Sequence, residues 1–130
     1  MHNVTKISSD TSVSKAANIM DQNHIGSMLV EKDDKVIGIM TERDILRKIV
    51  AKGKNPDILR VKDIMSYPII TIDANEHVLE ASAKIDKHRV RRLIVTENDE
   101  IIGKVTANSI ARNLKYSLTK GTSDYVMPEY

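Results

Sequence analysis

Apolar and polar residues follow two different periods along the first half of the chain. Short apolar runs typical of strands are "VTKI", "SMLVEK" and "KVIGIM", and the turn residues "DD" join the last two. After the first run, apolar residues recur at i, i+3, i+4 and i+7, the spacing of one helix face: Val13, Ala16, Ala17 and Met20. A second helix is predicted from Thr41 onward, with apolar positions at Ile45, Leu46, Ile49 and Val50. The pattern predicts the order strand, helix, strand, strand, helix.

The same order of signals returns 65 residues later. Shifting the chain by 65 residues aligns positions 3–50 with 68–115 without a gap, and 11 of the 48 pairs are identical. The second copy has the strand runs "IITI", "RLIVTE" and "EIIGKV" and a helix face at Val78, Ala81, Ser82 and Ile85. A repeat of this kind redefines the structural unit, which here has about 60 residues and occurs twice.

Turn-rich and helix-breaking residues separate the two copies. "AKGKNPD" is typical of a break, and "VKDIMSYP" predicts a short helix that Pro68 ends. After Leu118 the periodicity is lost. We therefore expect a first unit with its linker at residues 1–60, a second unit at 61–117 and a polar C-terminal tail at 118–130.

The size of the unit constrains the fold. A three-stranded sheet with helices cannot cover both of its faces in about 60 residues, whereas two units packed through their sheets can. The expected fold class is therefore α+β (or α/β), with two pseudo-two-fold-related β-α-β-β-α units. Such packing places equivalent loops side by side and creates a cleft with two equivalent sites.

Composition argues against several classes of function. The chain has no cysteine, which excludes disulfides and thiolate metal sites, and its four histidines lack metal-ligand spacing. No catalytic motif is found, so neither an enzyme nor a required cofactor is expected. A net charge of +2, with tyrosine as the sole aromatic type, gives little reason to expect nucleic acid binding. Without a signal peptide or a run of about 18 apolar residues, a soluble, cytoplasmic protein with no membrane partner is expected.

The element order and three segments together resemble a pair of CBS domains, also called a Bateman module. The segments are "VKDIMSYPIITI", "HRVRRLIVTENDEIIGKVT" and "GIMTERD", and the resemblance covers residues 3–116. It implies that an adenosine-containing ligand binds in the cleft between the units: AMP, ADP or ATP, and in some members S-adenosylmethionine. In the family's G-h-x-[ST]-x-x-D segment, the aspartate accepts hydrogen bonds from the ribose hydroxyls.

Carried over to this sequence, the resemblance implies one complete site. Asp44 would hold the ribose with the help of Thr41, and Arg91 and Arg92 of the facing unit would meet the phosphates. Arg92 is the better match of the two. The base and ribose pocket would be formed by Val4, Thr5, Ile25, Gly26, Ser27 and Ile39.

The equivalent second site departs from the family pattern. Its lining would be Ile69, Ile70, Val90, Thr106 and Ser109. Ser109 stands where Asp44 stands in the first copy, and Lys104 puts a cation in the expected base pocket. Gly26 and Ser27 stand where the phosphate-binding arginines would be. This site is therefore expected to be degenerate, either vacant or used differently.

Simpler interpretations stay open for both motifs. Thr41 and Asp44 have the spacing of a capping box, and a cap and a ligand site can coexist. "HRVRR" also has the composition of a solvated strand edge that resists aggregation.

The expected function is that of a stand-alone energy or metabolite sensor that forms a homodimer through its helices and signals to an unidentified effector protein. The alternatives are a protein or nucleic-acid interaction module and a sensor of S-adenosylmethionine.

Overall fold

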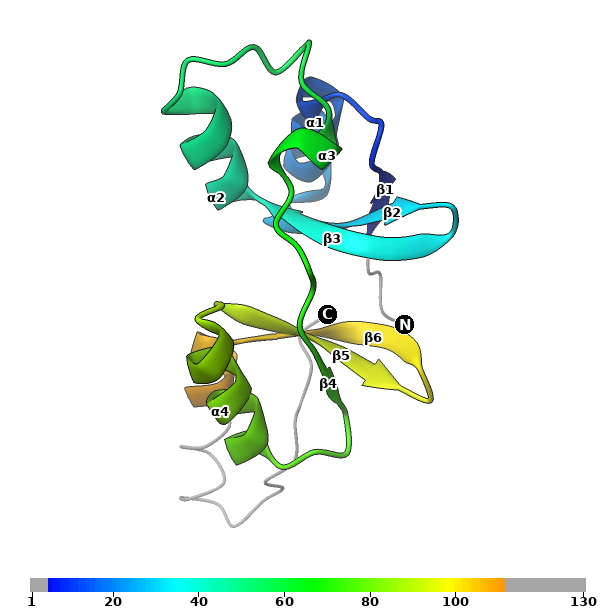
Figure 1. Cartoon of the computed structure of the whole chain (residues 1–130), viewed down its shortest axis with the longest axis vertical. Helices are drawn as coiled ribbons and strands as arrows, with labels where there is room; N and C mark the ends of the chain where they lie inside the picture. Colours follow the sequence, from blue (N-terminus) through cyan, green and yellow to red (C-terminus); the bar gives the residue numbers. More distant parts are fainter. Residues whose placement is uncertain (1–4, 112–130) are drawn as a thin grey trace. The chain divides into compact units, whose positions relative to one another are not determined.

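A computed structural model describes residues 5–111 of the 130-residue chain. Within that range the chain folds into two compact units (Figure 1). The first unit comprises Thr5–Ile69, and the second begins at Ile70. Both units have the same order of strands and helices, so the predicted repeat of a β-α-β-β-α unit is confirmed.

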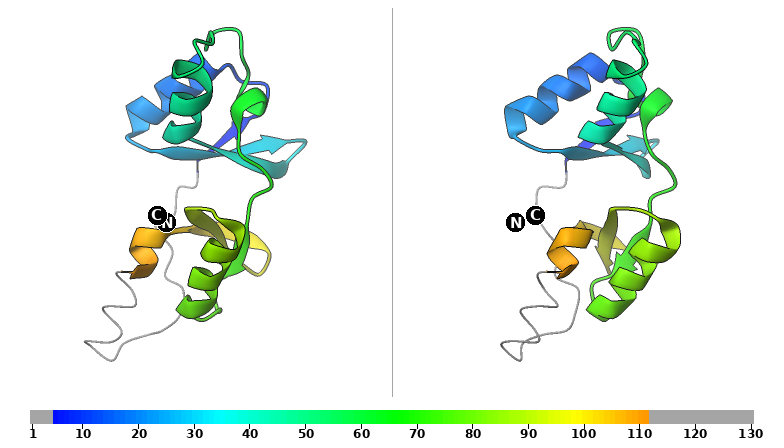
Figure 2. Two further views of the ribbon diagram at one scale, coloured as in Figure 1. Left: turned by 60° about the vertical axis from the view of Figure 1, so that its left-hand side comes forward. Right: turned by 90° about the vertical axis from the view of Figure 1, so that its left-hand side faces the viewer.

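The first unit is a three-stranded mixed sheet with its helices on one face (Figure 2). Its strands lie in the order β1 (Lys6–Ser8), β2 (Ser27–Lys32) and β3 (Lys35–Thr41). β1 is parallel to β2, and α1 (Val13–Asn23) makes the crossover that a parallel pair requires. β2 and β3 form an antiparallel hairpin. The helical segments that follow are α2 (Glu42–Ile45), the π-helical turn η1 (Leu46–Val50) and α3 (Val61–Ile64).

The second unit repeats this topology. Its elements are β4 (Thr71–Asp73), α4 (Val78–His88), β5 (Arg92–Glu97) and β6 (Glu100–Thr106), and residues 107–111 are helical. β4 is parallel to β5, and β5 is antiparallel to β6. The two hairpins share an irregularity at the same place, between Val30 and Glu31 in one and between Val95 and Thr96 in the other.

Turn residues have the same left-handed conformation in both copies. The residues that end α1 and α4, His24 and Arg89, both have φ 54°. The predicted hairpin turns have positive φ at both central residues, as tight hairpins with matching twist require: Asp33, Asp34, Asn98 and Asp99. Local conformation therefore repeats together with the element order.

Each unit has its own hydrophobic core between helix and sheet. Val13, Ala16 and Met20 of α1 are buried, and they share a core with Met28 and Val30, alternate residues of β2. The equivalent core of the second unit includes Val78, Ala81, Leu93 and Val95. The predicted face of the first helix is thus confirmed in α1, whereas in α4 it is confirmed at Val78 and Ala81, Ile85 is partly buried and Ser82 is exposed.

The connecting segment belongs to the first unit by its packing. Val61 and Ile64 of α3 are part of the first core. The Val61 N–H donates to Thr11 O at 2.8 Å, and the Lys62 N–H donates to Ser9 O at 3.0 Å. The sequence predicts that the second unit begins at residue 61, whereas the contacts keep residues 61–69 with the first unit. The predicted and observed boundaries differ because the apolar residues of α3 pack into the core of the first unit.

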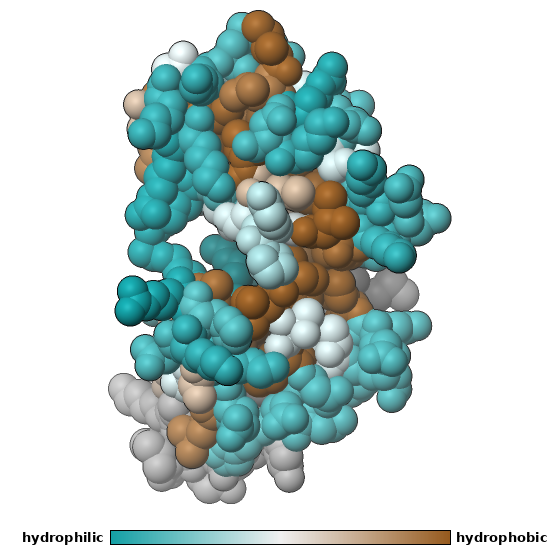
Figure 3. Space-filling model, in the orientation of Figure 1, coloured by the Kyte–Doolittle hydropathy of each residue, from teal (hydrophilic) through white to brown (hydrophobic). Residues whose placement is uncertain are grey.

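The helix after Thr41 buries only part of its predicted apolar face. Ile49 is 3% exposed, but Leu46 and Val50 are 59% and 65% exposed. Positions i and i+4 share a face, so Ile45 and Ile49 can face the core together while Leu46 and Val50 turn toward the surface. Hydrophobic residues, in brown, are visible at the surface among hydrophilic ones on the face shown in Figure 3. Within residues 5–111, no helix combines the length and hydropathy of a transmembrane span.

Candidate functional site

The junction between β3 and α2 contains the Thr41–Asp44 motif. Thr41 ends the strand in an extended conformation and is the N-cap of α2. Its Oγ1 accepts a hydrogen bond from the Asp44 N–H at 3.2 Å. In return, Asp44 Oδ2 accepts from the Thr41 N–H at 3.0 Å and from the Thr41 hydroxyl at 3.2 Å. The predicted capping box is therefore confirmed.

The second oxygen of Asp44 has two further donors. Asp44 Oδ1 accepts from the Ser66 hydroxyl at 2.9 Å and lies 3.1 Å from Lys48 Nζ. Lys48 Nζ also donates to Ile64 O at 2.8 Å. A carboxylate offers about four lone pairs, so these four contacts saturate Asp44, which is only 6% exposed.

Sequence reasoning missed both of these partners. Lys48 lies four residues after Asp44, a spacing that brings side chains together on a helix, so the sequence did contain that signal. Ser66 gave no signal, because it lies in the connecting segment, which the repeat does not duplicate within 3–50 and 68–115.

Several predicted pocket residues lie next to this junction. Ser27 pairs with Thr41 across the hairpin, and Ile39 pairs with Leu29. Gly26 O accepts from the N–H of Glu42, the first residue of α2, at 3.0 Å. Thr5 lies farther along the sheet, where its carbonyl accepts from the Leu29 N–H at 2.9 Å, and Ile25 follows α1. Val4 lies outside the described residues.

Gly38 lets the connecting segment approach β3. Ile39 and Ser66 exchange two backbone hydrogen bonds, of 3.0 and 2.8 Å. A Cβ atom on Gly38 would lie 2.8 Å from Ser66 O and 2.8 Å from Met65 Sδ, too close for either contact. Gly38 thus permits a close backbone approach, which places Ser66 within reach of Asp44.

The second unit builds the same cap without a carboxylate. Ser109 Oγ accepts from the Thr106 N–H at 2.8 Å, and Thr106 Oγ1 accepts from the Ser109 N–H at 3.1 Å. The Ser109 hydroxyl donates to Thr106 O at 3.0 Å. Ser109 is 4% exposed, so one neutral oxygen replaces the buried charge of the first unit.

The other residues predicted for the second site lie at positions equivalent to those of the first. Ile70 O accepts from the Ile94 N–H at 2.9 Å, as Thr5 O does from Leu29 in the first unit. Val90 follows α4 as Ile25 follows α1. Ile69 is the last residue of the first unit by its contacts.

Arg91 and Arg92 lie in the second unit. Arg92 begins β5 and pairs with Thr106, and Arg91 O accepts from the Ala107 N–H at 3.0 Å. The Arg91 side chain is exposed and that of Arg92 is partly exposed. The role of these arginines at the first site stays a prediction.

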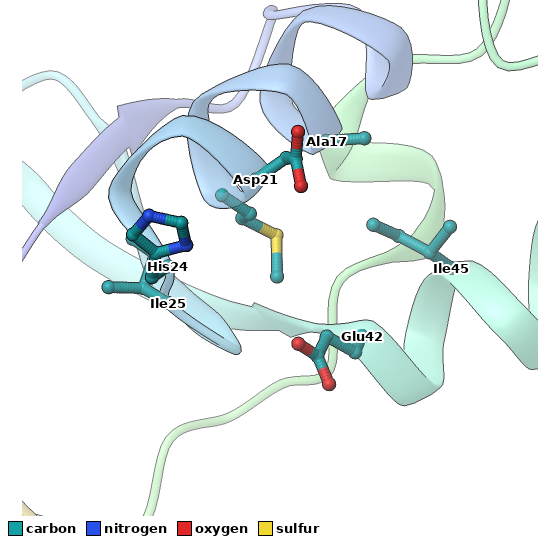
Figure 4. Close-up of a pocket in the computed structure, with 7 residues that line it drawn as sticks. Ala17, Asp21, His24, Ile25, Glu42 and Ile45 are labelled. Carbon is teal, nitrogen blue, oxygen red and sulfur yellow. The ribbon is translucent and has the colours of Figure 1, made fainter.

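A separate groove lies on the helical side of the first unit, between α1 and α2 (Figure 4). Its volume is about 430 Å³. Acidic and imidazole side chains stand around an apolar lining, and the residues involved are Ala17, Met20, Asp21, His24, Ile25, Glu42 and Ile45. In the described range 5–111, no three histidine, cysteine, aspartate or glutamate side chains are grouped so as to hold a metal ion.

Comparison with known proteins agrees with the repeat and with the fold. The family model described as CBS domain matches the chain twice, at residues 1–51 and 61–116. Uncharacterized protein MK0525 of Methanopyrus kandleri is 44% identical over 93 residues, which are 70% of this chain and 47% of that protein. The chain thus spans about half the length of this relative.

Two further relatives match over most of their length. Hypoxic response protein 1 of Mycobacterium tuberculosis is 31% identical over 112 residues, covering 85% of this chain and 78% of that protein. The crystal structure titled "CBS domain, NE2398" has a TM-score of 0.75 and 34% identity, covering 88% of this chain and 91% of the other. With both copies matched by the family model and the fold shared with a solved member, the chain belongs to the CBS domain family and contains a tandem pair of CBS domains.

Proposed function

We propose that this CBS pair is a regulatory module that binds an adenosine-containing ligand, AMP, ADP or ATP, at Asp44. One observation carries the proposal: a buried carboxylate is fixed at the start of α2, hydrogen-bonded to Thr41, which pairs with Ser27 across the hairpin. Two carboxylate oxygens suit the vicinal hydroxyls of a ribose. Hydrogen bonds to a charged acceptor are worth about 1.5–3 kcal/mol, enough to dominate the affinity of a small ligand.

The remaining contacts of the proposed site follow from chemistry and from the family resemblance. Ile25 and Ile39 offer apolar surface to the base, while Gly26 and Ser27 offer backbone groups. Arg92, and Arg91 beside it, would bind the phosphates, because a guanidinium presents a planar fork of donors to phosphate oxygens. The pocket at Ser109 lacks both the carboxylate and these cations, so we assign it no nucleotide.

The proposed regulation depends on linkage between ligand binding and the conformation of the pair. A ligand changes the state of a protein only when it binds two conformations with different affinity. A ligand held by residues of both units would favour one arrangement of the pair, and an effector protein could then distinguish that arrangement from others. We infer that the chain acts in this way as an energy or metabolite sensor.

A homodimer through the helices is the assembly that the exposed apolar residues support best. Leu46 and Val50 project from the helix that borders the groove between α1 and α2. A single exposed apolar side chain needs no explanation, but two apolar side chains on one helix face beside an apolar groove are typical of an interface. Leu46→Glu should lower the molar mass measured by light scattering toward that of the monomer. A wild-type chain that is already monomeric at high concentration would contradict this assembly.

The binding proposal is tested with a panel of AMP, ADP, ATP, S-adenosylmethionine and GMP in thermal unfolding. Ligand at about 100 times its dissociation constant should add about 2.7 kcal/mol of stability. In calorimetry, Asp44→Ala should weaken an adenine nucleotide by about 10- to 150-fold, and Ser109→Ala should have little effect. Equal losses in the two variants would rule out a single functional site.

The panel also separates the competing functions. A shift with S-adenosylmethionine alone would favour a sensor of that metabolite. No shift with any adenosine compound would favour an interaction module, for which the exposed "HRVRR" segment is the main support. In the nucleotide case, Arg92→Ala should weaken ATP more than adenosine, since only ATP has phosphates for the guanidinium to bind.

A further inference from the structure

The carboxylate proposed to hold the ribose is already engaged by the connecting segment. Ser66, which donates to Asp44 Oδ1, lies four residues before the start of the second unit. Lys48 contacts the same oxygen and also donates a hydrogen bond to Ile64 O at the end of α3. Asp44 is therefore tied to the connecting segment directly through Ser66 and indirectly through Lys48.

The four contacts of Asp44 differ in how easily they can be released. The two on Oδ2 belong to the cap of α2, and one of them satisfies the backbone N–H of Thr41. The two on Oδ1 come from side chains that solvent can reach: Ser66 is exposed, and the Lys48 side chain is 43% exposed. Once released, the hydroxyl and the ammonium can be hydrated, whereas the Thr41 N–H is partly buried and would lose the acceptor that caps the helix.

A ribose brings two hydroxyl donors to a carboxylate that has no free lone pair. We propose that Ser66 and Lys48 form a latch on Asp44 Oδ1, and that an adenosine ligand displaces this latch when its ribose binds. The occupied site then loosens the connecting segment at Ser66 and Ile64. This inference rests on the proposed function, and it names the element that responds to occupancy, the segment between α3 and the second unit.

The direction of coupling follows from the competition. Removing the Ser66 hydroxyl leaves Asp44 Oδ1 with one donor fewer, so the ligand has less to displace and should bind more tightly. By reciprocity, bound ligand should weaken the attachment of the segment by the same factor. The net value of one hydrogen bond corresponds to about a two- to tenfold change in affinity.

The test compares Ser66→Ala with Ser14→Ala in calorimetry with adenosine and AMP. Ser14 is the control, because its hydroxyl donates to Asp57 Oδ1, in the loop that precedes α3, and does not contact Asp44. Ser66→Ala should bind adenosine about two to ten times more tightly, and Ser14→Ala should bind as the wild type does. Weaker or unchanged binding by Ser66→Ala would overturn the latch, since the hydroxyl would then assist the ligand or be irrelevant to it.

A measurement without ligand separates failure of the latch from failure of the proposed function. In a double-mutant cycle of Asp44→Asn and Ser66→Ala, unfolding free energies that are not additive would show that the two side chains are coupled in the free protein. Ligand binding at Asp44 together with an additive cycle would overturn the latch alone. A coupled cycle together with no binding of any adenosine compound would overturn the proposed function and, with it, displacement of the latch by a ribose.

Discussion

The two units cap the start of the helix that follows their hairpin with different side chains, a carboxylate in the first and a hydroxyl in the second. Both helices start at a threonine whose N–H is bound by the side chain three residues later, at 3.0 Å in the first unit and 2.8 Å in the second. Ser109 uses its hydroxyl for this and then donates back to its own turn. Asp44 has a second oxygen, which reaches Lys48 and Ser66.

The difference shows that a carboxylate is not needed to start this helix. A serine satisfies the same backbone donor at a position that is equally buried, with 4% exposure against 6%. Burying a charge is costly unless it has donors. The carboxylate of Asp44 therefore adds interactions beyond the cap: those with the connecting segment and, on our proposal, those with a ribose.

The largest effect is expected when the second cap is installed in the first unit with Asp44→Ser. We expect ligand affinity to fall by about 10- to 150-fold, the equivalent of about 1.5–3 kcal/mol. Stability should fall by about 1–3 kcal/mol, because the cap is kept while two bonds are lost, those to the solvent-exposed Ser66 and Lys48 side chains. Calorimetry and urea unfolding measure the two quantities separately.

Asp44→Ala is the control for that variant. It also removes the cap acceptor, so it should be less stable than Asp44→Ser by about 1 kcal/mol, with a similar loss of ligand. If the serine variant kept wild-type affinity, the carboxylate would have no part in binding, and the proposed site would be wrong.

A second test separates the connecting segment from β3 without changing Asp44. Gly38→Ala places a methyl group 2.8 Å from Ser66 O and from Met65 Sδ, so the segment must shift. Overpacking of this kind costs about 1–3 kcal/mol, which urea unfolding can measure. Gly26→Ala is the matched control, because its methyl would lie 3.4 Å from the Glu42 carboxylate, an ordinary contact. Equal losses in the two variants would mean that the segment is not held as closely as the distances require.

The periodic parts of the fold could be predicted from the sequence because they depend on local pattern. "SMLVEK" and "RLIVTE" coincide with β2 and β5, and the helix faces at Val13 and Val78 are buried as their spacing predicts. The capping box at Thr41 was equally local. These features need only neighbouring residues, so one sequence suffices to find them.

The rest depends on contacts between residues far apart in the chain. Ser66 reaches Asp44 only because α3 joins the first core and Gly38 admits the segment beside β3. No periodicity connects positions 44 and 66, and the boundary expected at residue 61 placed the segment in the second unit. Nor does an apolar pattern show which residues of a helix pack into a core, so the exposure of Leu46 and Val50 could be read only from the structure.

The smallest expected effect concerns an ion pair at the other end of the connecting segment. Lys62 Nζ lies 2.9 Å from Asp10 Oδ1, whereas the position equivalent to Asp10 in the second copy is Asn75, which has no charge. The hydrogen bond and the charge of Lys62 lower the pKa of Asp10 below its usual 3.8, and Asp10 in turn raises the pKa of Lys62 above its usual 10.5.

The sign of the pH dependence follows from these shifts. Because the folded pKa of Asp10 is the lower one, its stabilisation is complete above pH 3.8 and is lost as the pH falls through the folded value. That of Lys62 is complete below pH 10.5 and is lost as the pH rises through its raised value. Both side chains are exposed, so salt should screen the pair and its effect should be small.

A double-mutant cycle of Asp10→Asn and Lys62→Met in urea unfolding should show coupling at neutral pH that disappears in strong acid and in high salt. Coupling that persists in acid would mean that the pair stabilises the segment through packing, and the charge difference between Asp10 and Asn75 would then have no energetic consequence.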